Sequence, residues 1–275
     1  MHACDPHQFS NELDESTIGR LIDRLESRAQ DNVFARLLDK YLSSLQISPS
    51  AKVLEVGCGT GAVLRHFVRS GDFGGKAFGV DQCMAFIEAA QRFSDEEKVS
   101  ERVEFHVGDA HRVNFSSSSF DVVIAHTLIS HVSDPAAVLR EMARVVRPGG
   151  TVVIFDGDYA SLTYAYPDYD FGREMDLALA NATFNNPHVM RELPRLLPEF
   201  GLKLIDAWGD AVVEIGSASY FKSFAETYAP FVAKTGFLPA EVVESWLAVQ
   251  RRAMENGTFF AACNYYTYLA CRIEE

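Results

Sequence analysis

The chain has 275 residues, of which 48% are hydrophobic and 23% charged, the composition of a globular protein with one large α/β domain or a core domain with a subdomain. Its formal net charge of −13 argues against a general nucleic-acid-binding protein, because neutralising phosphates needs clustered Lys and Arg, and it disfavours anionic membrane surfaces. No apolar run approaches the roughly 18 residues of a membrane span. Five cysteines without a CxxC pair predict neither a zinc site nor a disulfide framework, and they favour a cytoplasmic location.

The first segment with a clear pattern, residues 10–46, is predicted to form two helices. Apolar side chains recur every three or four residues from Ile18 to Leu25 and again from Val33 to Leu45. Two roles are open for these helices. They either cover an edge of a sheet or form a lid over a ligand site.

A short strand, a glycine turn and a helix follow one another between residues 52 and 68. The glycines of the turn are Gly57, Gly59 and Gly61. Because glycine has no side chain, such a turn lets a ligand approach the backbone, and the amides at the start of the helix point at that ligand. The spacing Gly57-x-Gly59-x-x-Ala62 satisfies the dinucleotide fingerprint, so the turn alone leaves the class of ligand open.

Polar side chains follow the predicted strands at their carboxyl ends. Strands that alternate with helices predict a parallel sheet, and ligands of such sheets bind beyond the carboxyl ends of the strands. An acid such as Asp81 can hold the ribose hydroxyls of an adenosine-containing ligand, or it can cap the helix that follows. The residues, with the strand that each follows, are Asp81 (76–80), Asp109 (103–107), His126 (120–125), and Asp156 and Asp158 (151–155).

The pattern changes after residue 160. Helices are predicted within 171–200, at 218–234 and at 240–256. A sixth strand is predicted from residue 202 toward 213, with a bend at Gly209-Asp210, and a long closing strand at 259–270.

No repeat or low-complexity linker separates these segments, so we expect one structural domain. Its parts are an N-terminal helical lid (1–47), a ligand-binding core (48–160) and a helical cap that also supplies the last two strands of the same sheet (161–275).

Several of these motifs occur together in one known family. In this order they resemble the class I S-adenosylmethionine (SAM)-dependent methyltransferases, in particular the small-molecule type of ubiquinone and menaquinone biosynthesis, which methylates carbon. The resemblance implies an α/β fold with a Rossmann-like seven-stranded sheet whose last strand is antiparallel. It also favours SAM over a dinucleotide. The matching motifs are Leu54-Glu55-Val56-Gly57-Cys58-Gly59-Thr60-Gly61, Gly79-Val80-Asp81, Gly108-Asp109-Ala110, Phe120-Asp121-Val122-Val123 and Arg147-Pro148-Gly149-Gly150.

The same resemblance implies a role for individual residues in binding the cofactor SAM. The three glycines pack against its methionine part, and one acid on each of the first three strands or strand ends serves the amino group, the ribose and the adenine. The residues implied are Gly57, Gly59 and Gly61 (methionine), Glu55 (amino group), Asp81 (ribose), Gln82 and Met84 (ribose and adenine), Asp109 and Ala110 (adenine), His126 (sulfonium) and Arg28 (carboxylate).

The implied reaction moves the methyl group of SAM to an O, N or C atom of a small molecule and releases S-adenosylhomocysteine. An acceptor that loses a proton needs a base, and the candidates are His126, His131 and Asp158. Neither a metal nor nucleic acid is expected, and a homodimer is left open. Aromatic residues that suit a flat or hydrophobic acceptor are Tyr159, Tyr164, Tyr166, Tyr169, Phe171, Phe184, Phe221, Phe224, Tyr228 and Phe231.

Two other functions stay open at this point. The first is a SAM-binding protein without turnover, such as an assembly factor. The second is an NAD-dependent oxidoreductase, which the glycine spacing permits and the remaining motifs disfavour.

Overall fold

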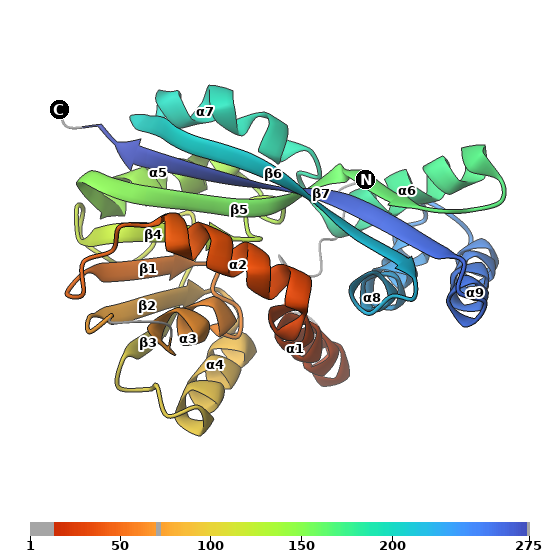
Figure 1. Ribbon diagram of the computed structural model, residues 1–275, viewed down its shortest axis with the longest axis horizontal. Helices are drawn as coiled ribbons and strands as arrows, with labels where there is room; N and C mark the ends of the chain where they lie inside the picture. The colour runs from red at the N-terminus through yellow and green to blue at the C-terminus, as the bar shows by residue number, and fades with distance from the viewer. Residues whose placement is uncertain (1–13, 70–72, 274–275) are drawn as a thin grey trace.

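The computed structural model describes residues 14–69 and 73–273, so the first 13 residues of the predicted lid lie outside the described part. Its centre is a sheet of seven strands in the order β3-β2-β1-β4-β5-β7-β6 (Figure 1). The first five strands run parallel, and β7 lies antiparallel between β5 and β6. This confirms the predicted fold class. The strands are β1 Lys52–Val56, β2 Lys76–Asp81, β3 Val103–Val107, β4 Phe120–His126, β5 Val146–Tyr164, β6 Leu202–Gly216 and β7 Phe259–Arg272.

Helices cover both faces of this sheet because successive side chains of a buried strand point to opposite faces. On β1, Val53 packs into a cluster with α2 and α3, whereas Leu54 and Val56 pack into a second cluster with α5 and α7. None of the described helices is long and apolar enough to cross a membrane. The helices are α1 Glu15–Gln30, α2 Asn32–Ser44, α3 Ala62–Arg69, α4 Met84–Glu96, α5 Pro135–Val145, α6 Tyr169–Thr183, the 3₁₀ turn η2 Val189–Arg191, α7 Leu193–Glu199, α8 Tyr220–Lys234 and α9 Ala240–Glu255.

One aspartate separates the two N-terminal helices. Asp31 is the residue at which α1 ends, and its carboxylate accepts hydrogen bonds from the amides of Val33 and Phe34 at the start of α2. A side-chain acceptor at this position satisfies amides that have no partner inside the helix. The chain therefore turns here, so that α2 lies over the sheet whereas α1 lies beyond the carboxyl ends of the parallel strands (Figure 1).

The strands after residue 145 are longer than the sequence predicted. β5 covers 19 residues, and with β6 and β7 it runs past the core toward α6, α8 and α9 (Figure 1). The predicted bend at Gly209-Asp210 is wrong. Both residues pair with β7, opposite Tyr266 and Tyr265, and the irregularity of β6 lies instead between Leu204 and Asp206. Regular pairing with a long partner strand outweighs the local turn tendency of a Gly-Asp pair.

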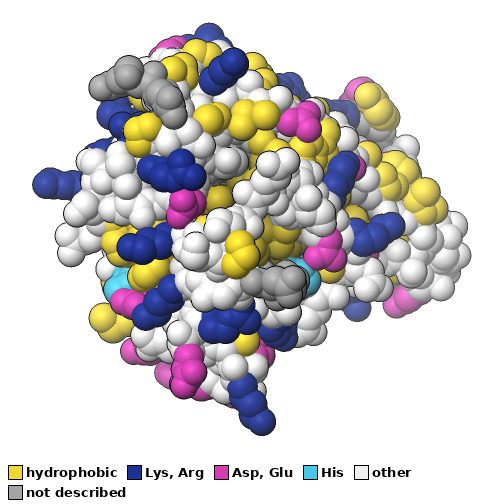
Figure 2. Space-filling view, turned by 60° about the vertical axis from the view of Figure 1, so that its left-hand side comes forward, with side chains coloured by type: hydrophobic (Ala, Val, Ile, Leu, Met, Phe, Trp, Pro, Cys, Tyr) yellow, Lys and Arg dark blue, Asp and Glu magenta, His cyan; other side chains and the backbone are white. Residues whose placement is uncertain are grey.

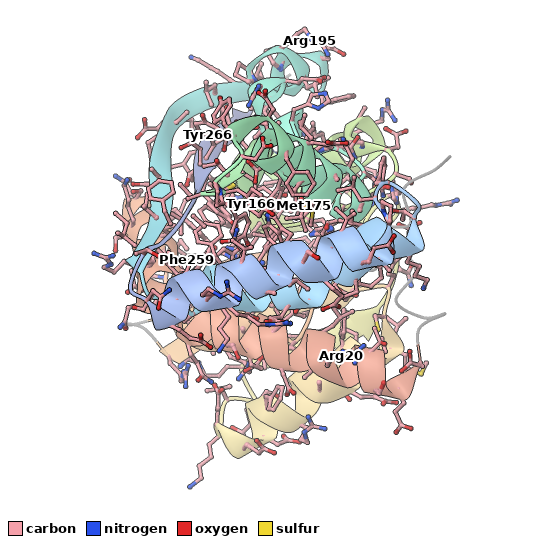
Figure 3. All side chains as sticks on the ribbon, turned by 90° about the vertical axis from the view of Figure 1, so that its right-hand side faces the viewer. Arg20, Tyr166, Met175, Arg195, Phe259 and Tyr266 are labelled. Carbon is pink, nitrogen blue, oxygen red and sulfur yellow. The ribbon has the colours of Figure 1, made fainter. Side chains whose placement is uncertain are left out.

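The helices at this end of the sheet form a second layer beside the lid. In Figure 3, α9 lies across the front, with α8 behind it and α1 below. Trp246 of α9 is fully buried, and Tyr164 at the end of β5 packs edge-on against its ring at 5.0 Å between centroids. The cap is therefore packed onto the extended strands and brings α8 next to α1.

Candidate functional site

A cavity of about 650 Å³ lies where the parallel strands end. Its walls come from α1, the glycine turn, the ends of β2 to β4, and α8. Most of the predicted cofactor residues lie on this wall, namely Arg28, Glu55, Gly57, Gly59, Asp81, Gln82, Asp109, Ala110 and His126.

The backbone of the glycine turn takes a conformation that other residues rarely adopt. Gly57 and Gly61 have φ angles of +69° and +73°. A Cβ atom on Gly57 would collide with the side chain of Leu128, and one on Gly61 with the ring of Phe105. Close packing against Leu128 and Phe105 thus requires glycine at these two positions. On the cavity side, the absence of side chains leaves the backbone accessible to a ligand.

Asp81, the last residue of β2, holds this turn in place. Its Oδ2 accepts a hydrogen bond from the Gly59 amide at 2.8 Å, and its Oδ1 accepts one from the Cys83 amide at 2.9 Å. Burial raises the pKa of this carboxyl, and the backbone donors oppose that rise. Each carboxylate oxygen keeps a second lone pair. Asp81 can therefore accept the two hydroxyls of a ribose while it fixes the turn.

Glu55 on β1 is a buried carboxylate that lacks a full set of partners. Its side chain is 2% exposed, and Oε2 has no hydrogen-bond partner among the described residues. Burial, and then the negative charge of Asp81, raise its pKa well above the usual range, while Arg28 and Arg65 oppose the shift. An unsatisfied carboxylate on a cavity wall suits a cationic group such as the ammonium of SAM.

The part of the cavity around Asp109, which the resemblance assigns to the adenine, is more open. Oδ1 of Asp109 accepts a hydrogen bond from the His111 amide at 2.9 Å and lies 2.6 Å from His111 Nδ1. Burial of Asp109 favours a higher pKa, but its bonds to His111 outweigh this and lower the pKa. The sequence analysis missed His111, although a histidine two residues after Asp109 is close enough to contact its carboxylate. Met84 does not join the wall, because its side chain points out of the fold with 57% exposure.

His126 lies at the end of β4, deep in the cavity. Its Nδ1 is 2.9 Å from the hydroxyl of Tyr41 on α2, and its ring lies 4.6 Å from that of Phe155. Burial, and then the charge of Arg28, lower its pKa well below the usual value. The imidazole is therefore neutral at physiological pH and a weak base. Tyr41 was predicted only as part of the apolar stripe of its helix.

His131 lies on the same wall, toward the aromatic end. Its ring is 4.9 Å from that of Phe184. Behind it is Asp156, which is fully buried and accepts hydrogen bonds from the amides of Ser130 at 2.9 Å and Gly157 at 2.8 Å. Burial raises the pKa of Asp156, and the nearby positive charge of His131 opposes that rise. The structure thus sets a buried acid beside an imidazole at the cavity.

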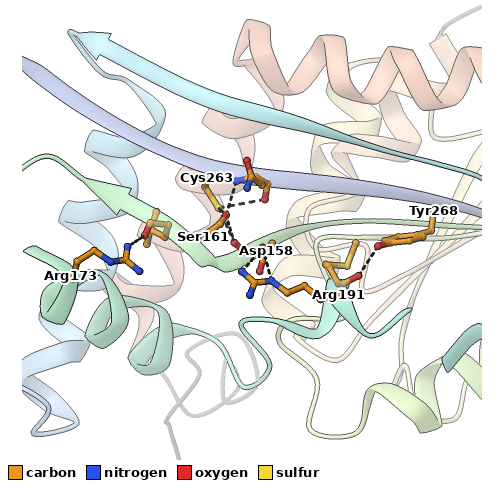
Figure 4. A network of polar contacts seen from close by, with 9 residues as sticks. Asp158, Ser161, Arg173, Arg191, Cys263 and Tyr268 are labelled. Atoms are coloured by element: carbon orange, nitrogen blue, oxygen red, sulfur yellow. Dashed lines mark hydrogen bonds and ion pairs between the residues drawn. The ribbon is translucent and has the colours of Figure 1, made fainter. Parts of the chain in front are cut away.

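Asp158 does not reach the cavity, contrary to the expectation that it faces the acceptor. Its Oδ2 accepts two hydrogen bonds from Arg191, from Nε at 2.9 Å and Nη2 at 2.8 Å (Figure 4). Its backbone carbonyl accepts from the Ser161 hydroxyl at 2.6 Å. Residues 156 and 158 lie on the same side of β5. After Asp158, the pairing of β5 with β7 shifts register before Thr163, and the sequence did not show this bulge. Asp158 therefore ties β5 to η2.

The far end of the cavity is lined by rings. Tyr159 and Phe184 stack with their centroids 3.5 Å apart, and α8 adds three more rings. Of the aromatic residues predicted for the pocket, Tyr159, Phe184, Phe224 and Tyr228 lie on its wall. Tyr220 also lines it and was missed. Of the remaining candidates, Tyr169 is exposed, and the others pack into or against the hydrophobic core, because the cap needs its own core; these are Tyr164, Tyr166, Phe171, Phe221 and Phe231.

We expect Asp81→Asn to weaken SAM binding about 10- to 100-fold, because the variant loses a charged acceptor whose hydrogen bonds are worth about 1.5–3 kcal/mol. Isothermal titration calorimetry measures this directly. The matched control is Asp95→Asn on the exposed side of α4. Equal affinities for Asp81→Asn and the parent protein would remove the ribose-binding role.

Glu55→Gln should stabilise the ligand-free protein at neutral pH. The folded state raises the pKa of Glu55, so the ionised side chain costs stability above that pKa, and the cost vanishes as the pH falls toward the ordinary value of 4.5. Urea unfolding at neutral and at mildly acidic pH measures the difference, which should shrink in acid.

In the same experiment Glu88→Gln, at an exposed position of α4, should change nothing at either pH. A Glu55→Gln protein that is less stable than its parent at neutral pH would contradict the interpretation. Its SAM affinity should fall, since the unsatisfied oxygen no longer carries a charge.

Comparison with known proteins identifies the family of this fold and site. Residues 54–154 match a methyltransferase domain. An uncharacterised 37.1 kDa protein in transposon TN4556 of Streptomyces fradiae is 28% identical over 269 residues, which cover 96% of this chain and 74% of that protein. Norajmaline N-methyltransferase of Rauvolfia serpentina is 31% identical over 134 residues, which cover 47% of this chain and 45% of that enzyme. The chain thus spans less than half of that enzyme's length.

Solved structures share the whole architecture at low sequence identity. Geranyl diphosphate methyltransferase in complex with SAM has a TM-score of 0.55 and 18% identity, covering 86% of this chain and 85% of that one. The [4+2]-cyclase SpnF has a TM-score of 0.58 and 19% identity, covering 87% and 82%. At these identities the likeness establishes the fold. The domain match, together with the cavity that carries Glu55, the glycine turn and Asp81, shows that residues 54–154 of this chain form a SAM-dependent methyltransferase domain.

Proposed function

We propose that this methyltransferase acts on a small molecule with an apolar or aromatic body, at an O, N or C atom, and that His131 is its base. The observation that carries this proposal is a continuous cavity of about 650 Å³, which joins the predicted cofactor residues to a wall of rings. A volume of this size has room for SAM and one small acceptor, and it is too small for a folded protein partner.

The surface supports a small acceptor. On the face drawn in Figure 2, Lys and Arg side chains are interspersed with acidic ones and form no broad basic patch. Such a surface does not favour a nucleic-acid backbone. The described cysteines, Cys58, Cys83, Cys263 and Cys271, are all free, which supports a reducing, cytoplasmic location as part of the proposal.

The lid supports the reaction by excluding water. Glu26 of α1 pairs with Arg65 of α3 at 2.6 Å, and Arg65 also pairs with Glu97. These charges close α1 over the cofactor end of the cavity. Bound SAM supplies an activated methyl group on a sulfonium. The task of the protein is then to align the acceptor and to take its proton.

His131 is preferred over His126 as the base. The low pKa and the Tyr41 contact make His126 a poor proton acceptor, and it suits a packing role beside the sulfonium. His131 lies closer in the fold to the ring-lined end, and the buried Asp156 stabilises the imidazolium that forms when His131 takes a proton. Asp158 takes no part, because Arg191 holds it outside the cavity.

The test of the proposed function is transfer of label. The protein is incubated with methyl-labelled SAM and a metabolite extract, and calorimetry is run in parallel with SAM, S-adenosylhomocysteine and NAD. Label in a small-molecule product supports the proposal. SAM binding without transfer from any extract would favour a non-catalytic SAM-binding protein. Binding of NAD alone would favour an oxidoreductase.

For an acceptor found in this way that must lose a proton, we expect His131→Asn to lower kcat by about 10²- to 10⁴-fold, the usual contribution of a general base. The affinity for SAM should stay within about twofold, since His131 does not hold the cofactor. The control is His188→Asn, on an exposed side chain outside the cavity.

The opposite pattern would exchange the roles of the two histidines. If His126→Asn abolished turnover while His131→Asn left kcat unchanged, the base would be His126 despite its low pKa. A pH profile of kcat adds a second readout, because loss of the base removes the acidic limb of the profile.

A further inference from the structure

Arg24 is a buried cation on the wall of the cavity. It lies on α1, one helical turn before Arg28, and only 7% of the residue is exposed. Both arginines face the cavity. A guanidinium stays protonated at any physiological pH, so Arg24 brings a permanent positive charge into the protein interior.

The groups around Arg24 are neutral. Its carbon Cζ lies 5.0–5.1 Å from the ring centroids of Tyr220, Phe224 and Tyr228. Its Nη1 donates a hydrogen bond to the hydroxyl of Ser223 at 3.0 Å. The three rings belong to α8 and line the cavity themselves. Their negative faces attract the guanidinium but supply no counter-charge.

Arg65, which lines the same cavity, is a buried arginine whose charge is neutralised by carboxylates. It is 3% exposed, and it forms ion pairs with both Glu26 and Glu97. Arg24 forms no ion pair with any carboxylate in the part of the chain that the structure describes. Burying a charge without a partner is costly, so such groups persist where a partner arrives or a function needs them.

We propose that Arg24 binds a carboxylate of the methyl acceptor, so that the substrate is a small aromatic or apolar carboxylic acid. This inference rests on the proposed function and names its substrate class. The rings that surround the guanidinium would contact the body of the acceptor, while the planar fork of Arg24 takes its carboxylate in two parallel hydrogen bonds. Arg28, whose charge acts on Glu55 and His126, serves the cofactor end.

A purely structural role predicts something different. If Arg24 only fastened α1 to α8 through Ser223, a neutral ligand would bind as well as a charged one, and replacing the arginine would change the stability of the protein without changing its preference for charge. The preference between matched charged and neutral ligands therefore separates the two roles.

The experiment uses calorimetry on the full chain saturated with S-adenosylhomocysteine. The probes are matched pairs, 4-hydroxybenzoate against 4-hydroxybenzamide and indole-3-acetate against indole-3-acetamide. We expect at least one carboxylate to bind about tenfold or more tightly than its amide, in line with a charge-assisted hydrogen bond. Arg24→Gln should abolish that preference, and Arg24→Lys should keep part of it.

The control is Arg20→Gln. Arg20 lies one turn earlier on α1 (Figure 3), and it is exposed. Its replacement should leave the preference for the carboxylate intact. The proposal is overturned if no carboxylate binds the parent protein more tightly than its amide, or if the preference survives in Arg24→Gln. Should Arg24→Gln fail to fold, the parent and Arg24→Lys proteins decide the matter.

A second measurement uses turnover. A metabolite extract is separated by anion exchange before it is incubated with labelled SAM. Label from the anionic fraction supports the proposal, and label from the neutral fraction alone overturns it. If SAM binds and no fraction accepts label, the proposed function fails, whereas the carboxylate preference is measured without turnover and is judged separately.

Discussion

The arrangement of the site depends on one carboxylate. Asp81 accepts hydrogen bonds from the amides of Gly59 and Cys83, and so joins the turn after β1 to the start of α4. Without this acceptor, the Gly59 and Cys83 amides would lose the partner that the folded chain gives them. The same two oxygens lie on the cavity wall, where the resemblance assigns them to the ribose. One residue thus fixes the backbone and presents the polar atoms that recognise the ligand.

The cofactor end of the cavity carries side chains of both charges. The negative charge of Asp81 adds to burial in raising the pKa of Glu55, and the positive charge of Arg28 on α1 offsets part of that rise. SAM carries both an ammonium and a carboxylate, and it meets an unsatisfied acid and a cation at this end. Buried charges of this kind are costly without partners and become favourable when oppositely charged groups bind beside them.

The two ends of the cavity differ in how strongly the fold constrains the residues that line them. The cofactor end is made from backbone amides and strand ends, where the fold leaves little freedom. The acceptor end is made from rings on α8 and on β5, together with Arg24. These residues come from α1, from the end of β5 and from the cap, all of which lie outside residues 54–154, the segment matched by the methyltransferase domain.

The sequence alone determined the sheet, the glycine turn and the acids at the ends of β1 to β3, because these features follow from local spacing and from the rule that parallel strands end at one edge. It did not determine the pairing of Asp158 with Arg191, or the long pairing of β6 with β7 that removes the bend at Gly209. Nor did it show that Arg24 lies buried among three rings. Those facts depend on contacts between residues from 33 to 199 positions apart, and only the tertiary structure brings such residues together.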